Sequence, residues 1–338
     1  MVARFTACAL LLVFGWAMVR TGTMADLAKR FTRPPARPAQ RQIEVLAETP
    51  EYRLVRHPLG ETRVPLAPKR IVSLCASGTD GLVALGMQPV LATTSWQEEG
   101  SFPYLSDKLA GVPLVRISGG INLEAVLAAK PDLIFVASYN ARSYAQLSRI
   151  APTVCLASGI GGNREERILD VGDVVGHSKQ AHTRLAEYRR RLRDARTSLS
   201  AAAAGQPVAF LRFRRNTCVI YTQTAMFGPL LFDQLGLTPD PAMPTVMTGG
   251  GWDVLSVERL STLQAEHIFT VVDPDSETYL RRVADTPIWK NLPAVLHNHV
   301  HRVAAGTWLS GDGLLGCEAI IDDVLAGMVP AGSDHASP

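Results

Sequence analysis

The sequence has few cysteines, little net charge and no motif that identifies an enzyme. Its 338 residues include five cysteines without a C-x-x-C pair, so a zinc site built from cysteines is not expected. Charged residues make up 19%, and the net charge is only +3. This composition excludes a nucleic-acid-binding protein. An apolar fraction of 47% is that of a folded globular protein.

The longest apolar run lies at the N-terminus, between Arg4 and Arg20. Its length is between that of a secretory signal and that of a membrane span. We therefore predict a signal peptide or membrane segment over residues 1–25 that exports the chain, and cleavage stays open. Residues 26–42 contain the proline-rich stretch "RPPARPAQRQ", which predicts an extended linker.

Short apolar runs alternate with helical patterns through two halves of the chain. This alternation predicts an α/β protein with two lobes, residues 43–177 and 204–330, each built on a mainly parallel sheet. Between them, residues 178–203 form one long amphipathic helical pattern without glycine or proline, and we expect a single interdomain helix there. Residues 331–338 are a tail. In such sheets a ligand binds at the carboxyl ends of the strands.

The four cysteines beyond the N-terminal segment are far apart in the sequence. Cys75, Cys155, Cys218 and Cys317 can pair in three ways, and the sequence does not choose among them. Cys155 and Cys218 lie in strand-like runs, where a buried free thiol is the simpler interpretation.

Candidate catalytic and metal-binding residues are weak. Ser77 follows a strand but has no G-x-S-x-G elbow around it. The stretch "HNHVH" places His297, His299 and His301 at alternating positions, which on one strand would face the same side and hold a metal. However, "LPAVLHNHVHRVAAG" reads as two strands that meet at a His-Asn turn, and the alternation then ends at the bend. We expect neither a metal site nor a cofactor.

Large aromatic residues stand just after strand-like segments or in glycine-rich loops. These residues are Trp96, Tyr139, Trp252 and Trp308. Together they predict an aromatic-walled pocket for a bulky ligand. Arg116, Arg212 and Arg214 are candidates for binding carboxylate, hydroxamate or catecholate oxygens through their guanidinium groups.

Several segments of the chain, in order, resemble the periplasmic iron–siderophore-binding proteins of ABC importers. The segments are "YRLVRHPLGETRVPLAPKRIVSL", "LEAVLAAKPDLIFVAS", "LSRIAPTV", "VLSVERLSTLQAEHIFTVV", "TPIWKNLPAV" and "RVAAGTWLSGDGLLGCEAIIDDVL". The resemblance covers nearly all of residues 52–325. It is strongest to the ferric-hydroxamate (ferrichrome-type) branch of the class III binding proteins. It implies two lobes joined by one long helix and a ferric chelate bound in a shallow cleft.

The resemblance also implies roles for single residues. Trp96, Tyr139, Trp252 and Trp308 match aromatic positions of the family, and the chelate-binding arginine of the family aligns near Ser118, two residues after Arg116. Glu258 in "SVERL" matches an acidic residue that docks onto arginines of the permease. The matching position in the first lobe is Ala145, so docking through that lobe is in doubt.

The sequence therefore predicts a monomeric, non-enzymatic protein of the periplasm, either free or tethered to the inner membrane, that delivers a ferric siderophore to an ABC permease. We favour a near-neutral hydroxamate complex, because the loop position suggests that Arg116 alone reaches the cleft. If Arg212 and Arg214 also point inward, an anionic catecholate or citrate complex fits better, because buried charge needs compensation. Cobalamin and haem are alternative ligands. A membrane-tethered metal-dependent enzyme that uses the "HNHVH" cluster is the alternative from another class.

Overall fold

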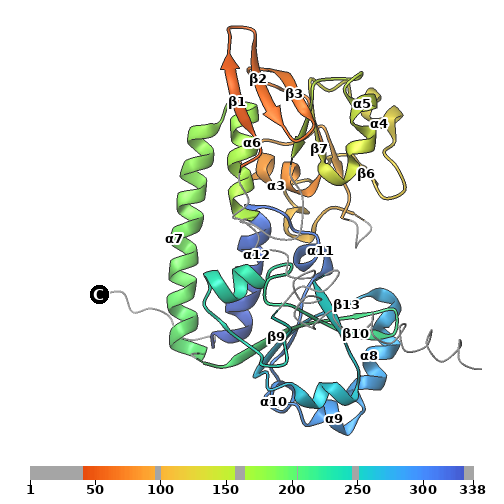
Figure 1. Ribbon diagram of the computed structural model, residues 1–338, viewed down its shortest axis with the longest axis vertical. Coiled ribbons are helices and arrows are strands. Elements are labelled where there is room, and N and C mark those ends of the chain that lie inside the picture. Colours follow the sequence, from red (N-terminus) through yellow and green to blue (C-terminus); the bar gives the residue numbers. More distant parts are fainter. Residues whose placement is uncertain (1–40, 96–99, 157–163, 204, 246–250, 331–338) are drawn as a thin grey trace, which may run out of the picture. The chain divides into compact units, whose positions relative to one another are not determined.

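Two α/β lobes and one long helix make up the folded part of the chain (Figure 1). The computed structural model describes residues 41–95, 100–156, 164–203, 205–245 and 251–330, which belong to one compact unit. The predicted N-terminal segment, nearly all of the linker and the tail lie outside the described residues. Within the described ranges, no helix is both long enough and apolar enough to cross a membrane.

The first lobe is built on a parallel five-stranded sheet that is buried on both faces. Strand β7 (Leu133–Ala137), with the sequence "LIFVA", is fully buried because helices cover both sides of the sheet. Helices α3 (Ala76–Ala84) and α6 (Arg167–Val175) pack on one face, and α4 (Leu123–Ala128) and α5 (Tyr144–Leu147) on the other. The strand order is β6-β5-β4-β7-β8, and the other strands are β4 (Ile71–Leu74), β5 (Leu91–Thr93), β6 (Leu114–Val115) and β8 (Thr153–Leu156).

An antiparallel sheet of three strands precedes this lobe, and the sequence patterns did not predict it. Its order is β1-β2-β3, with β1 (Glu44–Glu48), β2 (Tyr52–His57) and β3 (Gly60–Pro65). Three short 3-10 segments complete the first lobe: η1 (Pro103–Leu105), η2 (Ser138–Ser143) and η3 (Arg164–Glu166).

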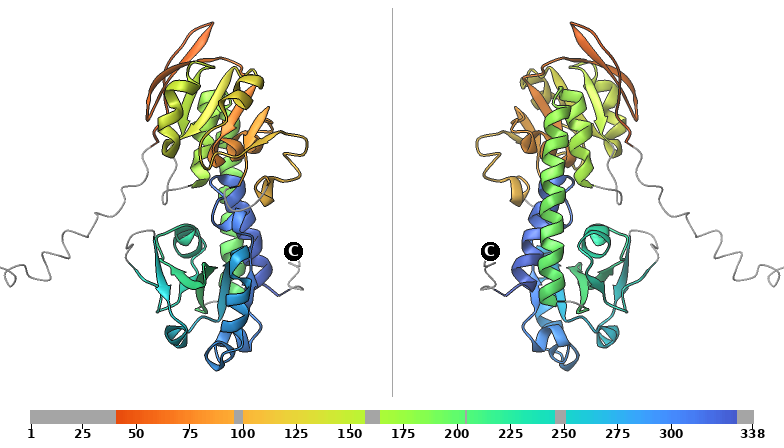
Figure 2. Two further views of the ribbon diagram at one scale, coloured as in Figure 1. Left: turned by 90° about the vertical axis from the view of Figure 1, so that its right-hand side faces the viewer. Right: turned by 90° about the vertical axis from the view of Figure 1, so that its left-hand side faces the viewer.

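Helix α7 (Ser178–Ala203) has the bounds that the sequence predicted. Its buried residues Ala181, Leu185, Tyr188 and Ala195 follow helical spacing, so they form one apolar stripe. This stripe packs against α6 and against the closing helix α12 (Leu314–Met328). In the two side views, α7 and α12 run together from one lobe to the other (Figure 2).

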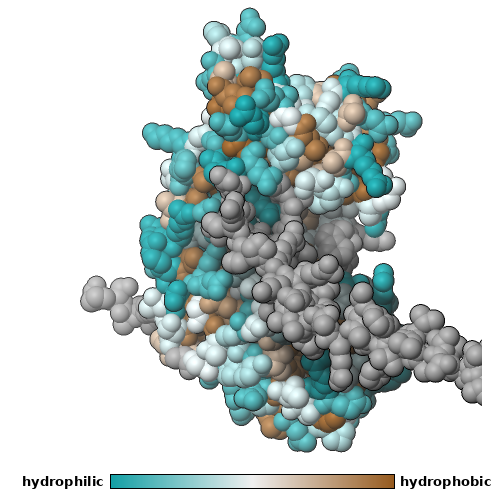
Figure 3. All heavy atoms as spheres, viewed as in Figure 1, coloured by the Kyte–Doolittle hydropathy of each residue, from teal (hydrophilic) through white to brown (hydrophobic). Residues whose placement is uncertain are grey.

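The opposite face of α7 is rich in arginine and partly solvated. Arg184 donates a hydrogen bond to Glu318 of α12 at 2.6 Å, and Arg191 forms an ion pair with Asp322 of the same helix. The space-filling view shows hydrophilic side chains along this edge of the molecule (Figure 3). These partly exposed pairs join the two helices but stabilise the fold little.

The second lobe contains a mixed sheet, whereas the sequence predicted a mainly parallel one. Strands β9, β11, β13 and β14 are parallel, but β10 runs antiparallel to β9 and to β12. Arg215 and Asn216 have φ of 45° and 56° and form the tight β9–β10 turn that reverses the chain. The order is β12-β10-β9-β13-β14, with β11 paired to β9, and the strands are β9 (Pro207–Arg214), β10 (Thr217–Tyr221), β11 (Thr238–Pro239), β12 (Trp252–Leu255), β13 (His267–Val272) and β14 (Val300–Arg302).

The hairpin expected around "HNHVH" was wrong. Pro293 begins a short helix, α10 (Pro293–Leu296), and the chain then enters β14, which pairs parallel to β13. Proline at the first position favours a helical turn because its fixed φ fits and its missing N–H is not needed there. The remaining segments are η4 (Pro229–Gln234), η5 (Glu258–Thr262), η6 (Pro274–Ser276), α8 (Glu277–Ala284), α9 (Pro287–Lys290) and α11 (Ala305–Trp308).

The four described cysteines, Cys75, Cys155, Cys218 and Cys317, are buried and free. Cys155 and Cys218 lie on strands β8 and β10 and pack as small apolar side chains in the core.

Candidate ligand-binding cavity

A cavity of about 730 Å³ lies where the carboxyl ends of strands from both lobes approach one another. Thr93 ends β5, Tyr139 follows β7, and Arg214 ends β9, so the parallel strands place polar side chains at one edge of each sheet. The segment Leu309–Asp312, between α11 and α12, completes the lining. The volume is that of a site for a small-molecule ligand.

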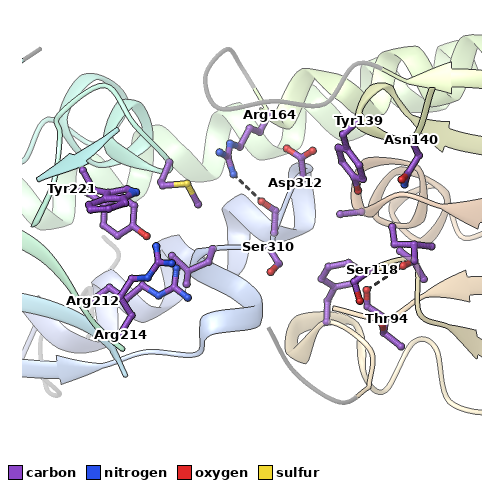
Figure 4. Close-up of a pocket in the computed structure, with 18 of the residues that line it drawn as sticks. Thr94, Ser118, Tyr139, Asn140, Arg164, Arg212, Arg214, Tyr221, Ser310 and Asp312 are labelled. Atoms are coloured by element: carbon purple, nitrogen blue, oxygen red, sulfur yellow. Dashed lines mark hydrogen bonds between the residues drawn. The ribbon is translucent and has the colours of Figure 1, made fainter. Parts of the chain in front are cut away.

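Two arginines of β9 enter the cavity from the second lobe. Arg212 and Arg214 are two residues apart on one strand, so they face the same side, as Figure 4 shows. Arg212 is 5% exposed and donates from Nε and Nη2 to the two carboxylate oxygens of Asp273, at 2.8 and 2.7 Å. This bidentate pair offsets most of the charge of Arg212 and holds its side chain in place.

Arg214 is different, because no described carboxylate forms an ion pair with it. Its guanidinium lies over the ring of Trp252, 5.4 Å from the ring centre. This contact orients the side chain along the cavity wall and leaves its N–H groups available to a ligand.

A third arginine, Arg164 of η3, reaches the cavity from the first lobe and lies between Arg212 and Tyr139 in Figure 4. Arg164 is 6% exposed, and its Nη1 donates to the carbonyl oxygen of Gly311 at 2.9 Å. Its guanidinium lies 4.3 Å from the ring centre of Phe227, and its Nε has no hydrogen-bond partner among the described residues. Burial lowers the pKa of Arg164. A buried cation without a carboxylate partner is costly, and an anionic ligand would offset that cost.

The described lining of the cavity carries excess positive charge. Among the described residues, three arginines line it against one carboxylate, Asp312, which forms an ion pair with Arg167. Tyr221 adds a hydroxyl beside Arg212. Burial raises the pKa of Tyr221 although the arginines beside it act in the opposite direction, so the hydroxyl remains a hydrogen-bond donor at neutral pH.

Apolar and neutral polar side chains form the rest of the wall. Phe102, Ile117, Met226 and Leu309 contribute apolar surface. Across the cavity from Arg212 and Arg214, the first lobe places Thr94, Ser118, Tyr139 and Asn140 (Figure 4). The cavity combines a basic side, a neutral hydrogen-bonding side and an apolar wall.

Five residues predicted from the sequence line this cavity: Ser118, Tyr139, Trp252, Arg212 and Arg214. Arg116 is exposed and is not among the described lining residues. Trp308 is fully buried and packs in the core, so its side chain lies behind the cavity wall and does not line it. Trp96 lies outside the described residues.

Sequence reasoning missed Arg164, Tyr221, Asn140 and Asp312, all of which line the cavity. Tyr221 ends β10, which runs antiparallel to β9, so the argument from the carboxyl ends of parallel strands does not extend to it. Arg164 has no such signal either, because it reaches the cavity from a short segment far from any strand end.

Comparison with known proteins gives one consistent family. A family model described as "Periplasmic binding protein" matches residues 71–305. Bacillus subtilis contains a "Probable siderophore-binding lipoprotein YfiY" that is 29% identical over 80% of this chain and 86% of its own length. Also in B. subtilis, the "Iron(3+)-hydroxamate-binding protein YxeB" is 29% identical over 75% of this chain and 78% of its own length.

A solved structure supports the same fold. Staphylococcus aureus SirA complexed with staphyloferrin B is 28% identical to this chain, with a TM-score of 0.67. The match covers 81% of this chain and 97% of SirA.

Proposed function

The chain belongs to the periplasmic binding protein family, and we propose that it captures a ferric siderophore and delivers it to an ABC permease for iron uptake. The relatives are named for siderophore and iron–hydroxamate binding, and the SirA structure contains staphyloferrin B. The cavity lies at the strand ends where such two-lobe proteins bind ligands. The observation that carries the proposal is this cavity, with its basic side and its apolar wall.

The lining suits a preassembled iron complex and not a bare metal ion. Among the described residues that line the cavity there is one carboxylate and no histidine or cysteine. Iron in a siderophore is already coordinated by the chelator, so the protein needs to recognise only the outside of the complex. Arginine and tyrosine donors for chelator oxygens, together with an aromatic surface, meet that need. We therefore propose a binding protein and not an enzyme.

The charge of the cavity favours an anionic complex of the carboxylate or catecholate kind. From the sequence we favoured a near-neutral hydroxamate complex, on the expectation that Arg116 alone reaches the cleft, with an anionic complex as the better fit if Arg212 and Arg214 point inward. Arg212 and Arg214 line the cavity, Arg116 is not among its described lining residues, and Arg164 adds a third cation. Arg164 and Arg214 have no described ion-pair partner, so anionic oxygens on the outside of a chelate could form ion pairs with both guanidinium groups.

Tryptophan fluorescence titration tests the proposal with ferric citrate, a ferric catecholate and a ferric hydroxamate at low and high salt. We expect the anionic complexes to bind more tightly and to lose affinity as salt rises. Arg214→Gln should weaken their binding by about 10- to 100-fold, the worth of one charge-assisted hydrogen bond. Arg215→Gln is the matched control, because Arg215 is exposed in the adjacent turn and is not among the described lining residues.

The outcomes separate the function from the ligand class. If none of the ferric complexes binds, the siderophore function is wrong. If the hydroxamate complex binds most tightly, with little salt dependence and no effect of Arg214→Gln, only the anionic class is wrong.

We also propose that export by the N-terminal segment brings the protein to the periplasm, either free or tethered to the inner membrane. Glu258 begins η5 on the second lobe and is exposed, so its carboxylate is available to arginines of a permease. Glu258→Lys should reduce transport in cells while ligand affinity of the purified protein stays unchanged. If Glu258→Lys also lowers the ligand affinity of the purified protein, its reduced transport would not support a docking role for Glu258.

A further inference from the structure

A second group of metal-ligand side chains lies in the second lobe, away from the ligand cavity. The ligand atoms of Glu266, His297 and His299 lie within 4.8 Å of one another. Glu266 directly precedes β13, His297 directly follows α10, and His299 directly precedes β14. Two imidazoles and a carboxylate are the donor set that zinc and similar divalent cations prefer.

The backbone holds these three residues in a defined arrangement. The N–H of His299 donates to the carbonyl oxygen of Ala294 at 2.7 Å, and the carbonyl oxygen of His299 accepts from the N–H of Ile268 at 3.0 Å. Asn298 between the two histidines has a φ of 60°, which reverses the chain so that both imidazoles return toward Glu266. The turn is therefore anchored to α10 on one side and to the sheet on the other.

The ring of His299 makes the second contact that is common for metal-binding histidines. Its Nδ1 lies 3.2 Å from the carbonyl oxygen of Glu266. A carbonyl oxygen can only accept, so Nδ1 carries the proton and Nε2 keeps its lone pair for a metal. Metal-binding histidines usually donate their second ring N–H to a carbonyl or carboxylate in this way. The ring also stacks on His267, with centroids 4.3 Å apart and planes 4° from parallel, which fixes its plane.

Glu266 and His297 supply the other two ligands. Oε2 of Glu266 lies 2.8 Å from Nδ1 of His297, and the His297 side chain is 55% exposed. A tetrahedral zinc ion with bonds of about 2.0–2.2 Å separates its ligand atoms by roughly 3.3–3.6 Å. Small side-chain rotations of the exposed His297 and the half-buried Glu266 would reach this spacing, and the fourth position would face water.

His301 does not belong to this group, although "HNHVH" suggested three alternating ligands. Its Nε2 lies 3.1 Å from Nδ1 of His267, and its ring packs against Phe269. The third member of the group is Glu266 and not His301, and Glu266 lies 31 residues before His297 in the sequence.

We propose that Glu266, His297 and His299 bind one divalent transition-metal ion of the zinc type, at a site separate from the ligand cavity. Arg212 of the cavity pairs in register with Val271, four residues along β13 from His267. At about 3.3 Å per residue, that separation is roughly 13 Å, and Glu266 lies one residue further away. The bound ion would join the residue before β13 to the turn between α10 and β14.

Calorimetric titration of the full-length protein, prepared without a polyhistidine tag, with zinc chloride tests this proposal. We expect one zinc ion per chain and a higher Tm with zinc than with EDTA, and no such effect of magnesium. His299→Ala, His297→Ala and Glu266→Gln should each weaken zinc binding by about tenfold or more. Cobalt should give the visible absorption of a tetrahedral site in the wild type, and this absorption should be lost in the variants.

His182→Ala is the matched control, because His182 is an exposed histidine on α7. It should bind zinc as the wild type does. Circular dichroism spectra establish that each variant is folded, and the exposed His297 makes His297→Ala the variant least able to disturb the fold. Absence of zinc binding at tenfold molar excess, or equal affinity in the wild type and in all three ligand variants, would overturn the proposal.

Discussion

Replacement of Trp308 by alanine should cost the protein stability and leave the ligand contacts intact. Trp308 ends α11 and is fully buried. Its ring lies against Phe269, with centroids 5.1 Å apart, and against Phe210 at 5.2 Å. Its Nε1 donates to a carboxylate oxygen of Asp323, on α12, at 2.7 Å. The side chain therefore joins the second sheet to the closing helix.

The magnitude follows from these contacts. Truncation of a buried tryptophan to alanine costs about 3–5 kcal/mol through lost burial and the cavity left behind. Asp323 is half-buried and would lose its donor, and the lost hydrogen bond adds about 0.5–1.5 kcal/mol. Since domains are stable by about 5–15 kcal/mol in total, Trp308→Ala should unfold at much lower urea concentration or fail to fold at 25 °C. Trp308→Phe keeps a ring and loses only the hydrogen bond, so it should remain folded.

The assay combines urea unfolding, followed by far-UV circular dichroism, with ferric-ligand titration. Trp252→Ala is the comparison, because Trp252 lines the cavity beneath Arg214. Trp252→Ala should weaken ligand binding by about 1–3 kcal/mol, the range for an aromatic contact, with a smaller loss of stability. Trp308→Phe should show lower stability and wild-type affinity. A Trp308 variant with unchanged urea midpoint and weakened binding would refute this reasoning and place Trp308 in the site.

Two further predictions concern the junction between α3 and α12. Asp80 on α3 is fully buried and accepts hydrogen bonds from the backbone N–H groups of Leu315 and Gly316, and burial raises its pKa to about 6. The pKa of Asp80 in the native state exceeds the unfolded value of about 3.9, so the native state binds more protons between these two pKa values. The free energy of unfolding therefore falls as pH rises from 4 through 6, by up to about 3 kcal/mol. Asp80→Asn should lack this pH dependence in urea unfolding, and an equal dependence in both proteins would contradict the assignment. A Cβ at Gly313 would lie 2.3 Å from the Asp80 carboxyl group, so Gly313→Ala should cost about 1–3 kcal/mol in urea unfolding. The cost should be smaller in an Asp80→Gly background, which removes both the carboxyl group and the Cβ that would lie 2.6 Å away, and equal costs in the two backgrounds would exclude the steric cause.

The parts of the fold that depend on local periodicity could be predicted from the sequence. Helix α7 has one apolar stripe at helical spacing over its whole length and no glycine or proline, so its bounds were clear. The buried strand β7 is a continuous apolar run, which indicates a parallel strand covered on both faces. The antiparallel strand β10 has a similar apolar run, and its direction depends on the tight turn at Arg215–Asn216, which carries no glycine. Its orientation was therefore missed.

Glycines of the segment Gly311–Gly316 show why the site itself was harder to predict. The segment reads G-x-G-x-x-G before a helix, a pattern typical of phosphate binding. Here the backbone N–H groups that begin α12 are taken by Asp80, and added side chains at Gly311 or Gly313 would collide with Thr307 or Asp80. The glycines serve close packing between the lobes. Only a contact between residues 235 positions apart reveals this role.

The same helix explains why Trp308 and Arg214, which the sequence treated alike as residues at strand ends or in loops, have different environments. Helix α12 begins against α3 of the first lobe and runs toward the second lobe, and its side chain Asp323 holds Trp308 in the core. Arg214 is the last residue of β9, and its guanidinium lines the cavity. By strand period Arg212 and Arg214 lie on the same face as Phe210, which packs against Trp308, so their position near the end of β9, and not the face, brings them to the cavity. Because α12 is anchored to both lobes, through Trp308 on one side and Asp80 on the other, the ligand meets a cavity whose two sides are already joined before it binds.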